Sequence, residues 1–273
     1  MKWSFTTLGC PDWTLEQIAA NAKAHGYHGV ELRTHQDGNH LSPDAPAGEV
    51  RAVAEMFEKH GVSVMSVMGY SRFAFLDGDE VRRNQDLVRK LIPIAVALGA
   101  RHIRTFAGQV PKGQTTATML PILADALRPL AAEAARAGVA METHDDWCAS
   151  DVLVKLARAI ASPKGFGIVW DVCNCIQADI EPWRASYRRL KPLIRYCHVK
   201  DGYVAADGSF QYAALGAGDL PWVDVVKVLR TDRFKGYLSF EWEKKWHPEL
   251  EPPERVFPQY THKMASLLAA KKR

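Results

Sequence analysis

The chain has 273 residues, of which 47% are hydrophobic, and its 35 basic and 31 acidic residues leave a net charge of only +4. That small excess argues against nucleic acid and acidic membranes as partners. Because the most apolar stretch, residues 91–100, is too short to span a bilayer and no signal-like segment opens the chain, we expect a cytoplasmic protein.

The first half of the chain repeats one pattern, in which a short apolar run is followed by a longer amphipathic run that ends in Gly. The apolar runs, typical of buried strands, are residues 3–7, 29–33, 62–68 and 102–106. The amphipathic runs, typical of helices, are residues 15–26, 48–61, 81–99 and 123–138. Strand and helix therefore alternate from the start.

The second half continues the alternation. Strands are predicted at residues 139–143, 166–171, 193–199 and 237–241. Helices are predicted at residues 152–165, 180–192, 222–236 and 257–273. Eight strand–helix units in 273 residues predict a single α/β domain, residues 1–273, folded as a (β/α)8 TIM barrel. An open doubly wound sheet is the weaker alternative, and no G-x-G-x-x-G follows the first strand to support it.

In such a barrel the chemistry lies where the strands end, and four consecutive strand ends carry metal-ligand side chains. They are Glu142, Asp171, His198 and Glu241. Adjacent strands lie about 4.8 Å apart, so these side chains can converge on one ion. Three carboxylates and one imidazole favour Mn²⁺ or Mg²⁺, and Co²⁺, Fe²⁺ or Zn²⁺ are also compatible. Any one of the four alone would be read as a helix cap or loop residue.

Other residues near these strand ends are candidates for the reaction. His144 has the same strand parity as Glu142 and is a candidate base, with simple loop polarity as the alternative. Lys200 has the parity of His198 and can neutralise an oxyanion, unless it is a surface lysine. Trp147, Trp242 and Trp246 can stack on sugar faces or belong to the core. Asp145 and Asp146 are expected to cap the following helix.

The sequence resembles the xylose-isomerase-like sugar phosphate isomerase/epimerase superfamily. The resemblance rests on the Glu, Asp, His, Glu series together with "GVEL" at residues 29–32, "HVKD" at 198–201 and "GDLPW" at 218–222. It implies that Glu142, Asp171, His198 and Glu241 bind one divalent ion. It also implies that Glu142 and Glu241 act as acid and base on opposite faces of a small carbohydrate, as in the ketose epimerases.

Two positions depart from those epimerases. Asn174 stands where they carry a substrate-binding His, and Ala217 stands where many relatives carry Glu. Asn174 can still hydrogen-bond a substrate hydroxyl, but its amide cannot move a proton at neutral pH. Lyases and dehydratases of keto-sugars, keto-glycosides or keto-inositols therefore stay as an alternative, in which His144 is a separate base.

The isomerases and lyases of this family share their first step. A carbonyl oxygen and the neighbouring hydroxyl chelate the ion, which stabilises the enediolate formed when a base removes the adjacent proton. Returning the proton gives an epimer or isomer, which is the predicted activity. Expelling a leaving group gives elimination. Whether the substrate is phosphorylated is left open by the sequence.

Two alternatives belong to other functional classes. Endonuclease IV shares the barrel but needs a three-zinc cluster with further histidines, where this chain has "VMGY", "TFAG" and Asn174. A sugar-binding barrel without catalysis has the same metal ligands and stays open, as does the oligomeric state.

Overall fold

The eight strands form a closed barrel in the computed structural model, which describes residues 1–134, 136–206 and 208–269. Neighbouring strands pair in parallel in the order β1-β10-β7-β6-β5-β4-β3-β2. They are β1 (Lys2–Thr6), β2 (Gly29–Arg33), β3 (Ser63–Met68), β4 (His102–Thr105), β5 (Gly138–Glu142), β6 (Phe166–Asp171), β7 (Ile194–Val199) and β10 (Tyr237–Phe240). The predicted closed barrel is therefore confirmed, and the open sheet is wrong.

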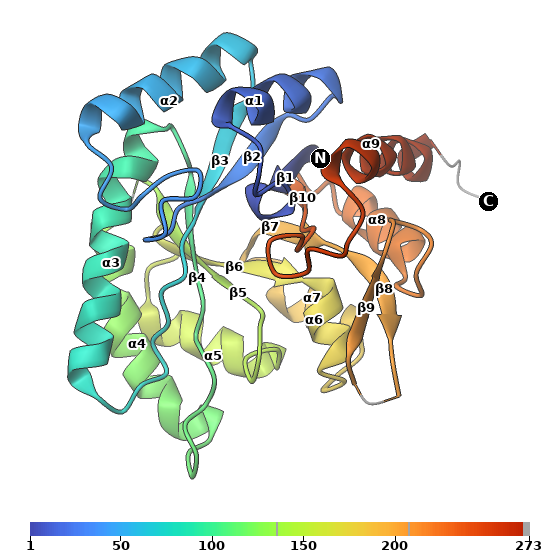
Figure 1. Cartoon of the computed structure of the whole chain (residues 1–273). Helices are drawn as coiled ribbons and strands as arrows, with labels where there is room; N and C mark the ends of the chain where they lie inside the picture. The colour runs from blue at the N-terminus through green and yellow to red at the C-terminus, as the bar shows by residue number, and fades with distance from the viewer. Residues whose placement is uncertain (135, 207, 270–273) are drawn as a thin grey trace.

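Helices connect the strands and surround the barrel (Figure 1). They are η1 (Thr7–Gly9), α1 (Leu15–Ala24), α2 (Ala47–His60), α3 (Gly78–Ala97), α4 (Thr116–Glu133), α5 (Ser150–Ile160), α6 (Val172–Gln177), α7 (Trp183–Leu190), α8 (Trp222–Thr231) and α9 (Pro253–Ala269). The sequence placed α4 too late in the chain and did not predict α6. Residues 270–273, where the last helix was expected to continue, lie outside the described residues.

The helix ends show why these segments start and stop where they do. Thr14 and Gln17 form a capping box at the start of α1, in which each side chain accepts a hydrogen bond from the other's backbone N–H. Gly61 ends α2 with a left-handed φ of 66°, as the sequence predicts. The fifth helix ends earlier than predicted, because Ala161 adopts the left-handed conformation (φ 54°). Local capping chemistry thus fixes the boundaries that apolar periodicity alone leaves open.

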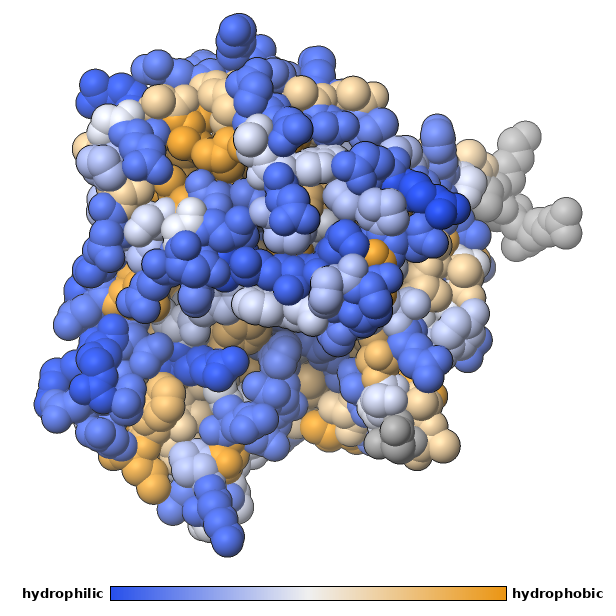
Figure 2. Space-filling view, in the orientation of Figure 1, coloured by the Kyte–Doolittle hydropathy of each residue, from blue (hydrophilic) through white to orange (hydrophobic). Residues whose placement is uncertain are grey.

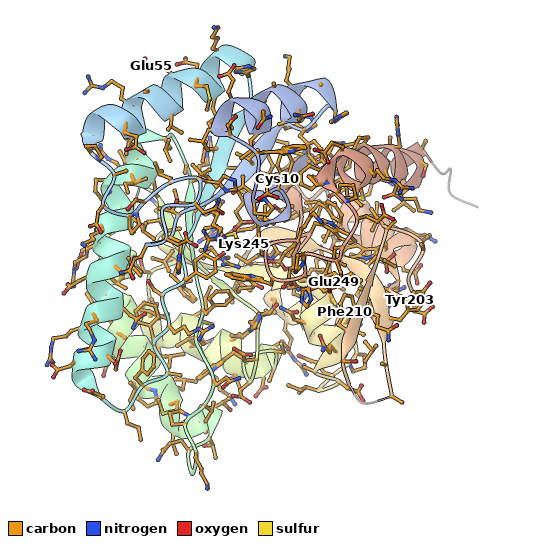
Figure 3. All side chains as sticks on the ribbon, viewed as in Figure 1. Cys10, Glu55, Tyr203, Phe210, Lys245 and Glu249 are labelled. Carbon is orange, nitrogen blue, oxygen red and sulfur yellow. The ribbon has the colours of Figure 1, made fainter. Side chains whose placement is uncertain are left out.

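An antiparallel hairpin, β8 (Asp201–Val204) and β9 (Phe210–Ala213), follows β7 and was not predicted. Tyr203 and Phe210 mark it in Figure 3. Buried Asp201 holds the hairpin to the segment before α8, because its carboxylate accepts backbone N–H bonds from Gly216 (2.6 Å) and Leu220 (3.3 Å). The "HVKD" and "GDLPW" motifs are therefore joined in space, and they fix the chain that leaves the mouth of the barrel.

A small apolar cluster closes the barrel below its polar end. Met65, Ala140, Val169 and Tyr196 come from four different strands and pack together. The last three lie two residues before Glu142, Asp171 and His198, so they share the same strand faces. This cluster is thus the floor on which the polar side chains of the barrel stand.

The face seen in Figure 2 is mainly hydrophilic, with small and separate apolar patches. Such scattered apolar surface is ordinary for a folded domain. Among the described residues, no helix combines the length and the apolar character needed to cross a membrane.

Candidate metal centre and its cavity

Four side chains from neighbouring strands meet at one end of the barrel. Glu142 and Asp171 are the last residues of β5 and β6, and His198 lies in β7, paired with Asp171 in register. Glu241 follows β10 directly, and its backbone N–H donates to Val199. One ligand atom from each of the four lies within 4.8 Å of all the others, and none of these residues is more than 3% exposed.

The distances within the cluster suit a single cation. Nδ1 of His198 lies 3.2 Å from a Glu241 oxygen, 3.6 Å from a Glu142 oxygen and 3.9 Å from Oδ2 of Asp171. Ligands about 2.1 Å from an octahedral ion would lie about 3 to 4.2 Å apart. Among the described residues, Nδ1 of His198 and Oδ2 of Asp171 make no hydrogen bond of normal geometry although both are buried. These residues therefore fit a divalent ion.

Two cationic side chains stand beside the four ligands. Lys200 donates to Oε2 of Glu241 (2.9 Å) and Oε1 of Glu243 (3.2 Å), and its Nζ lies 3.1 Å from Asp171. Arg104 of β4 donates to Oε2 of Glu142 (2.8 Å). Both cations are almost fully buried, which is tolerated because the carboxylates compensate their charge. The sequence named Lys200 but missed Arg104.

The charges of the cluster shift its titrations strongly. Burial raises the pKa of Glu142, but the positive charges of His198 and Arg104 outweigh it and lower that pKa to about 2. Burial also raises the pKa of Glu241, and His198 and Lys200 lower it well below its usual range. Burial lowers the pKa of His198, but the surrounding carboxylates raise it by more, so the pKa lies well above its ordinary value.

Glu31 of β2 supports the cluster from behind. Its Oε2 accepts a hydrogen bond from Nε2 of His198 (2.9 Å), so Nδ1 is the ring nitrogen that faces the carboxylates. Its Oε1 accepts from the hydroxyl of Tyr196 (2.6 Å) and more weakly from Ser66 (3.4 Å), and its Oε2 also accepts from Ser239 (3.3 Å). A carboxylate behind a histidine ligand is the usual way to fix ring orientation and tautomer. Sequence reasoning used Glu31 only as part of "GVEL".

A cavity of about 290 Å³ adjoins the cluster, and Glu142, Glu241 and Glu243 form its acidic wall. The rings of Tyr70, Phe106 and Trp246 form much of the rest, together with Arg72, Arg104 and His144. Ligand cavities are commonly about 300–1,000 Å³, so this one suits a small molecule. Lys245 and Glu249, labelled in Figure 3, lie on the loop that carries Trp246.

His144 lies in this cavity wall, with Nδ1 3.0 Å from Oδ2 of Asp145. Burial lowers the pKa of His144, but its bond to Asp145 and the charge of Glu142 raise it above its ordinary value. The expected helix-capping role of Asp145 and Asp146 is wrong. α5 begins after Ala149 without a side-chain cap, and Asp146 instead accepts from the backbone N–H of Val110.

The remaining predicted substrate residues lie outside the cavity wall. Trp147 is fully buried and donates its indole N–H to Gly108, and Trp242 is 2% exposed and donates to Glu251. Both are packed in the apolar core, which is the alternative that the sequence leaves open for them. Asn174 donates to the backbone of Thr143 (3.0 Å) and more weakly to Glu142 (3.4 Å). In this structure its amide therefore holds the end of β5, where the candidate metal ligand Glu142 lies.

Comparison with known proteins fits this geometry. The profile of the family described as xylose isomerase-like TIM barrel matches residues 19–259. The chain belongs to this family. A search of curated proteins with this chain finds no significant match.

Solved structures with the same fold cover almost the whole chain. The probable 3-DHS dehydratase AsbF of Bacillus anthracis, involved in petrobactin synthesis, has a TM-score of 0.77 and 17% identity and covers 99% of this chain and 100% of its own. The 3-keto-D-glucoside 4-epimerase YcjR of E. coli has a TM-score of 0.76 and 15% identity, with 99% and 100% covered. The IolI protein with a bound zinc atom has a TM-score of 0.81 and 15% identity, with 98% of each covered. At such low identities these likenesses establish the fold alone.

Proposed function

We propose that this protein is a metal-dependent enzyme that removes a proton from the carbon next to a carbonyl in a small carbohydrate. The observation that carries the proposal is the set of four buried ligand atoms, mutually within 4.8 Å, beside a cavity of small-molecule size. The first candidate product is an epimer or isomer, formed when the proton returns to the substrate. The solved structures that share this fold include an epimerase and a probable dehydratase, which is consistent with this class of chemistry.

Glu142, Asp171, His198 and Glu241 would hold one divalent ion, with Mn²⁺ or Mg²⁺ favoured by three carboxylates and Zn²⁺ compatible. When bound, such an ion supplies Lewis acidity that lowers the cost of negative charge on the substrate oxygens. The chain's own residues do the rest. Lys200 and Arg104 keep Glu241 and Glu142 ionised, and the aromatic rings of the cavity wall exclude water around the substrate.

A second candidate, elimination by a lyase or dehydratase, is favoured by how the two glutamates are paired. One oxygen of Glu142 accepts from Arg104 and one oxygen of Glu241 accepts from Lys200, so each carboxylate is a weakened base. His144 has no such cationic partner. Its Nδ1 faces Asp145, which leaves Nε2 to accept a proton from a molecule in the cavity. Lys200 would then balance the negative charge that develops on the leaving group.

Proton exchange in D₂O tests the common first step. The Mg²⁺-loaded protein is incubated with ketoses, keto-inositols and 3-keto-glycosides, and deuterium next to the carbonyl is followed by NMR. We expect at least one compound to exchange. A labelled epimer or isomer supports the first candidate, whereas an unsaturated ketone or a released aglycone supports elimination.

Three controls assign the exchange to this site. Metal-free protein and Glu241→Gln should both lose it, because the first lacks the ion and the second lacks one of its four ligands. Glu249→Gln is the matched control, since Glu249 is an exposed glutamate on the loop that follows Glu241, and it should exchange normally. Equal exchange in wild type, metal-free protein and Glu241→Gln would refute the proposal.

A further inference from the structure

Two arginines from separate strand ends line the same cavity. Arg104 belongs to β4, and Arg72 lies in the loop after β3. The guanidinium carbon of Arg104 is 4.2 Å from the centre of the Phe106 ring, and that of Arg72 is 5.9 Å from it. Both guanidinium groups therefore lie near the same ring, and their carbons are no more than about 10 Å apart.

Neither arginine has its donors fully used. Arg104 donates through Nη1 to Glu142 and through Nη2 to the carbonyl of Gly69, whereas its buried Nε has no acceptor among the described residues. Arg72 has no carboxylate within ion-pair distance in the described chain. By contrast, Arg33 near the same mouth is matched by Asp37 in a two-bonded pair.

The loop that carries Arg72 is held in place rather than merely exposed. The backbone N–H of Arg72 donates to the side chain of Asn84 (2.9 Å), and that of the adjacent Phe73 donates to the carbonyl of Ala107 (2.8 Å). The stem of Arg72 crosses Gly108, where an added Cβ would lie 3.2 Å from the Cβ of Arg72 and where φ is +92°. A glycine in this conformation thus gives the arginine stem its path toward the cavity.

The acids around the cavity are already engaged by other groups. Glu142 faces Arg104, and Glu241 and Glu243 accept from Lys200. Asp145, the acid whose pKa Arg72 lowers after the larger effect of His144, is bonded to His144. Arg72 is therefore a cation at the cavity wall without a committed anion from the protein.

We propose that the substrate carries an oxyanion group, a carboxylate or a phosphate, that binds between Arg72 and Arg104. This inference rests on the proposed function, because it names the substrate class of the same site. The anion would take up the free donors of both arginines, and the rest of the molecule would then lie beside Glu142 and Glu241, which are 2.8 and 3.7 Å from Nη1 of Arg104. A neutral sugar would leave Arg72 without an anion, whereas Arg104 would keep only Glu142.

Matched pairs of probes test the proposal without turnover. Quinate is compared with its neutral amide, and fructose 6-phosphate with fructose, by calorimetry on metal-free and Mg²⁺-loaded protein. One charge-assisted hydrogen bond corresponds to about 10- to 100-fold in affinity. We expect the anionic member of at least one pair to bind more tightly by about this factor, and more weakly as salt is added. The pair that discriminates identifies carboxylate or phosphate.

Arg72→Gln should remove the discrimination and unfold at the wild-type temperature, because the side chain is exposed. Arg51→Gln is the matched control, since Arg51 is an exposed arginine on α2 outside this cavity, and it should bind like wild type. Equal binding of anionic and neutral probes would overturn the proposal, and so would discrimination that survives in Arg72→Gln.

The outcome is separable from that of the D₂O experiment. Anion discrimination that depends on Arg72 but is accompanied by no proton exchange supports the subsite and counts against the proposed reaction. Exchange of neutral ketoses, together with exchange of their anionic counterparts that is no faster and does not change in Arg72→Gln, supports the reaction and overturns the anionic substrate.

Discussion

Replacing Glu31 by Gln tests how the His198 imidazole is held. Both carboxylate oxygens of Glu31 are acceptors in the structure, one for Nε2 of His198 at 2.9 Å and the other for the Tyr196 hydroxyl at 2.6 Å. A Gln amide offers one acceptor and one NH₂ group. It must therefore turn its NH₂ group toward either His198, where a donor then faces the Nε2–H, or Tyr196, whose hydroxyl oxygen can accept the bond; in both cases the negative charge behind His198 is lost.

The expected loss falls on metal affinity. If the amide donor faces His198, the ring loses the carboxylate that keeps its proton on Nε2 and leaves Nδ1 free for the ion. Removal of such a partner typically costs 10- to 100-fold in metal affinity, or about 1.4–2.7 kcal/mol. Tyr196→Phe is the matched control. It removes the 2.6 Å bond but leaves the Glu31 charge and the His198 bond in place, so its loss should be smaller.

Calorimetric titration of Mn²⁺ into metal-free wild type, Glu31→Gln and Tyr196→Phe measures these losses. Urea unfolding of the same metal-free proteins separates a change in affinity from a change in folding. Equal Mn²⁺ affinity for wild type and Glu31→Gln would refute the argument that this bond orients the ligand.

Two further predictions concern histidines. His144→Asn should bind the metal ion normally and lose about 10²–10⁴-fold in turnover if His144 is the base; unchanged turnover would return the proton transfer to the glutamates. Burial, followed by the charges of Arg195 and Arg101, lowers the pKa of His102 from 6.5 to about 4. Between those values the unfolded chain binds the proton and the folded chain does not, so up to about 3 kcal/mol of stability is present above pH 6.5 and lost toward pH 4. Urea unfolding should show this loss in wild type and in the exposed control His262→Gln but not in His102→Gln, and an equal loss in all three would contradict it.

The barrel could be predicted because each of its strands is an apolar run followed by an amphipathic helix. The four candidate ligands could be found because parallel strands place their carboxyl ends at one rim. Glu142, Asp171, His198 and Glu241 therefore share a location that follows from the topology alone. Their convergence within 4.8 Å agrees with that prediction.

Other parts of the site depend on contacts between segments far apart in the chain. Glu31 and Arg104 are buried charged residues inside β2 and β4, and their partners His198 and Glu142 are 167 and 38 residues away. A charged residue in a buried strand indicates a partner elsewhere in the fold, because an unpaired buried charge is costly. Trp147 and Trp242 show the opposite case, because a tryptophan at a strand end packs equally well into the core or against a ligand.

Metal analysis tests most directly whether the four strand-end residues form one metal site. We predict that wild-type protein loaded with Mn²⁺ and desalted holds about one ion per chain, and that Asp171→Ala holds none while keeping the wild-type circular dichroism spectrum. No bound ion in the wild type, or one ion per chain in both proteins, would contradict the account.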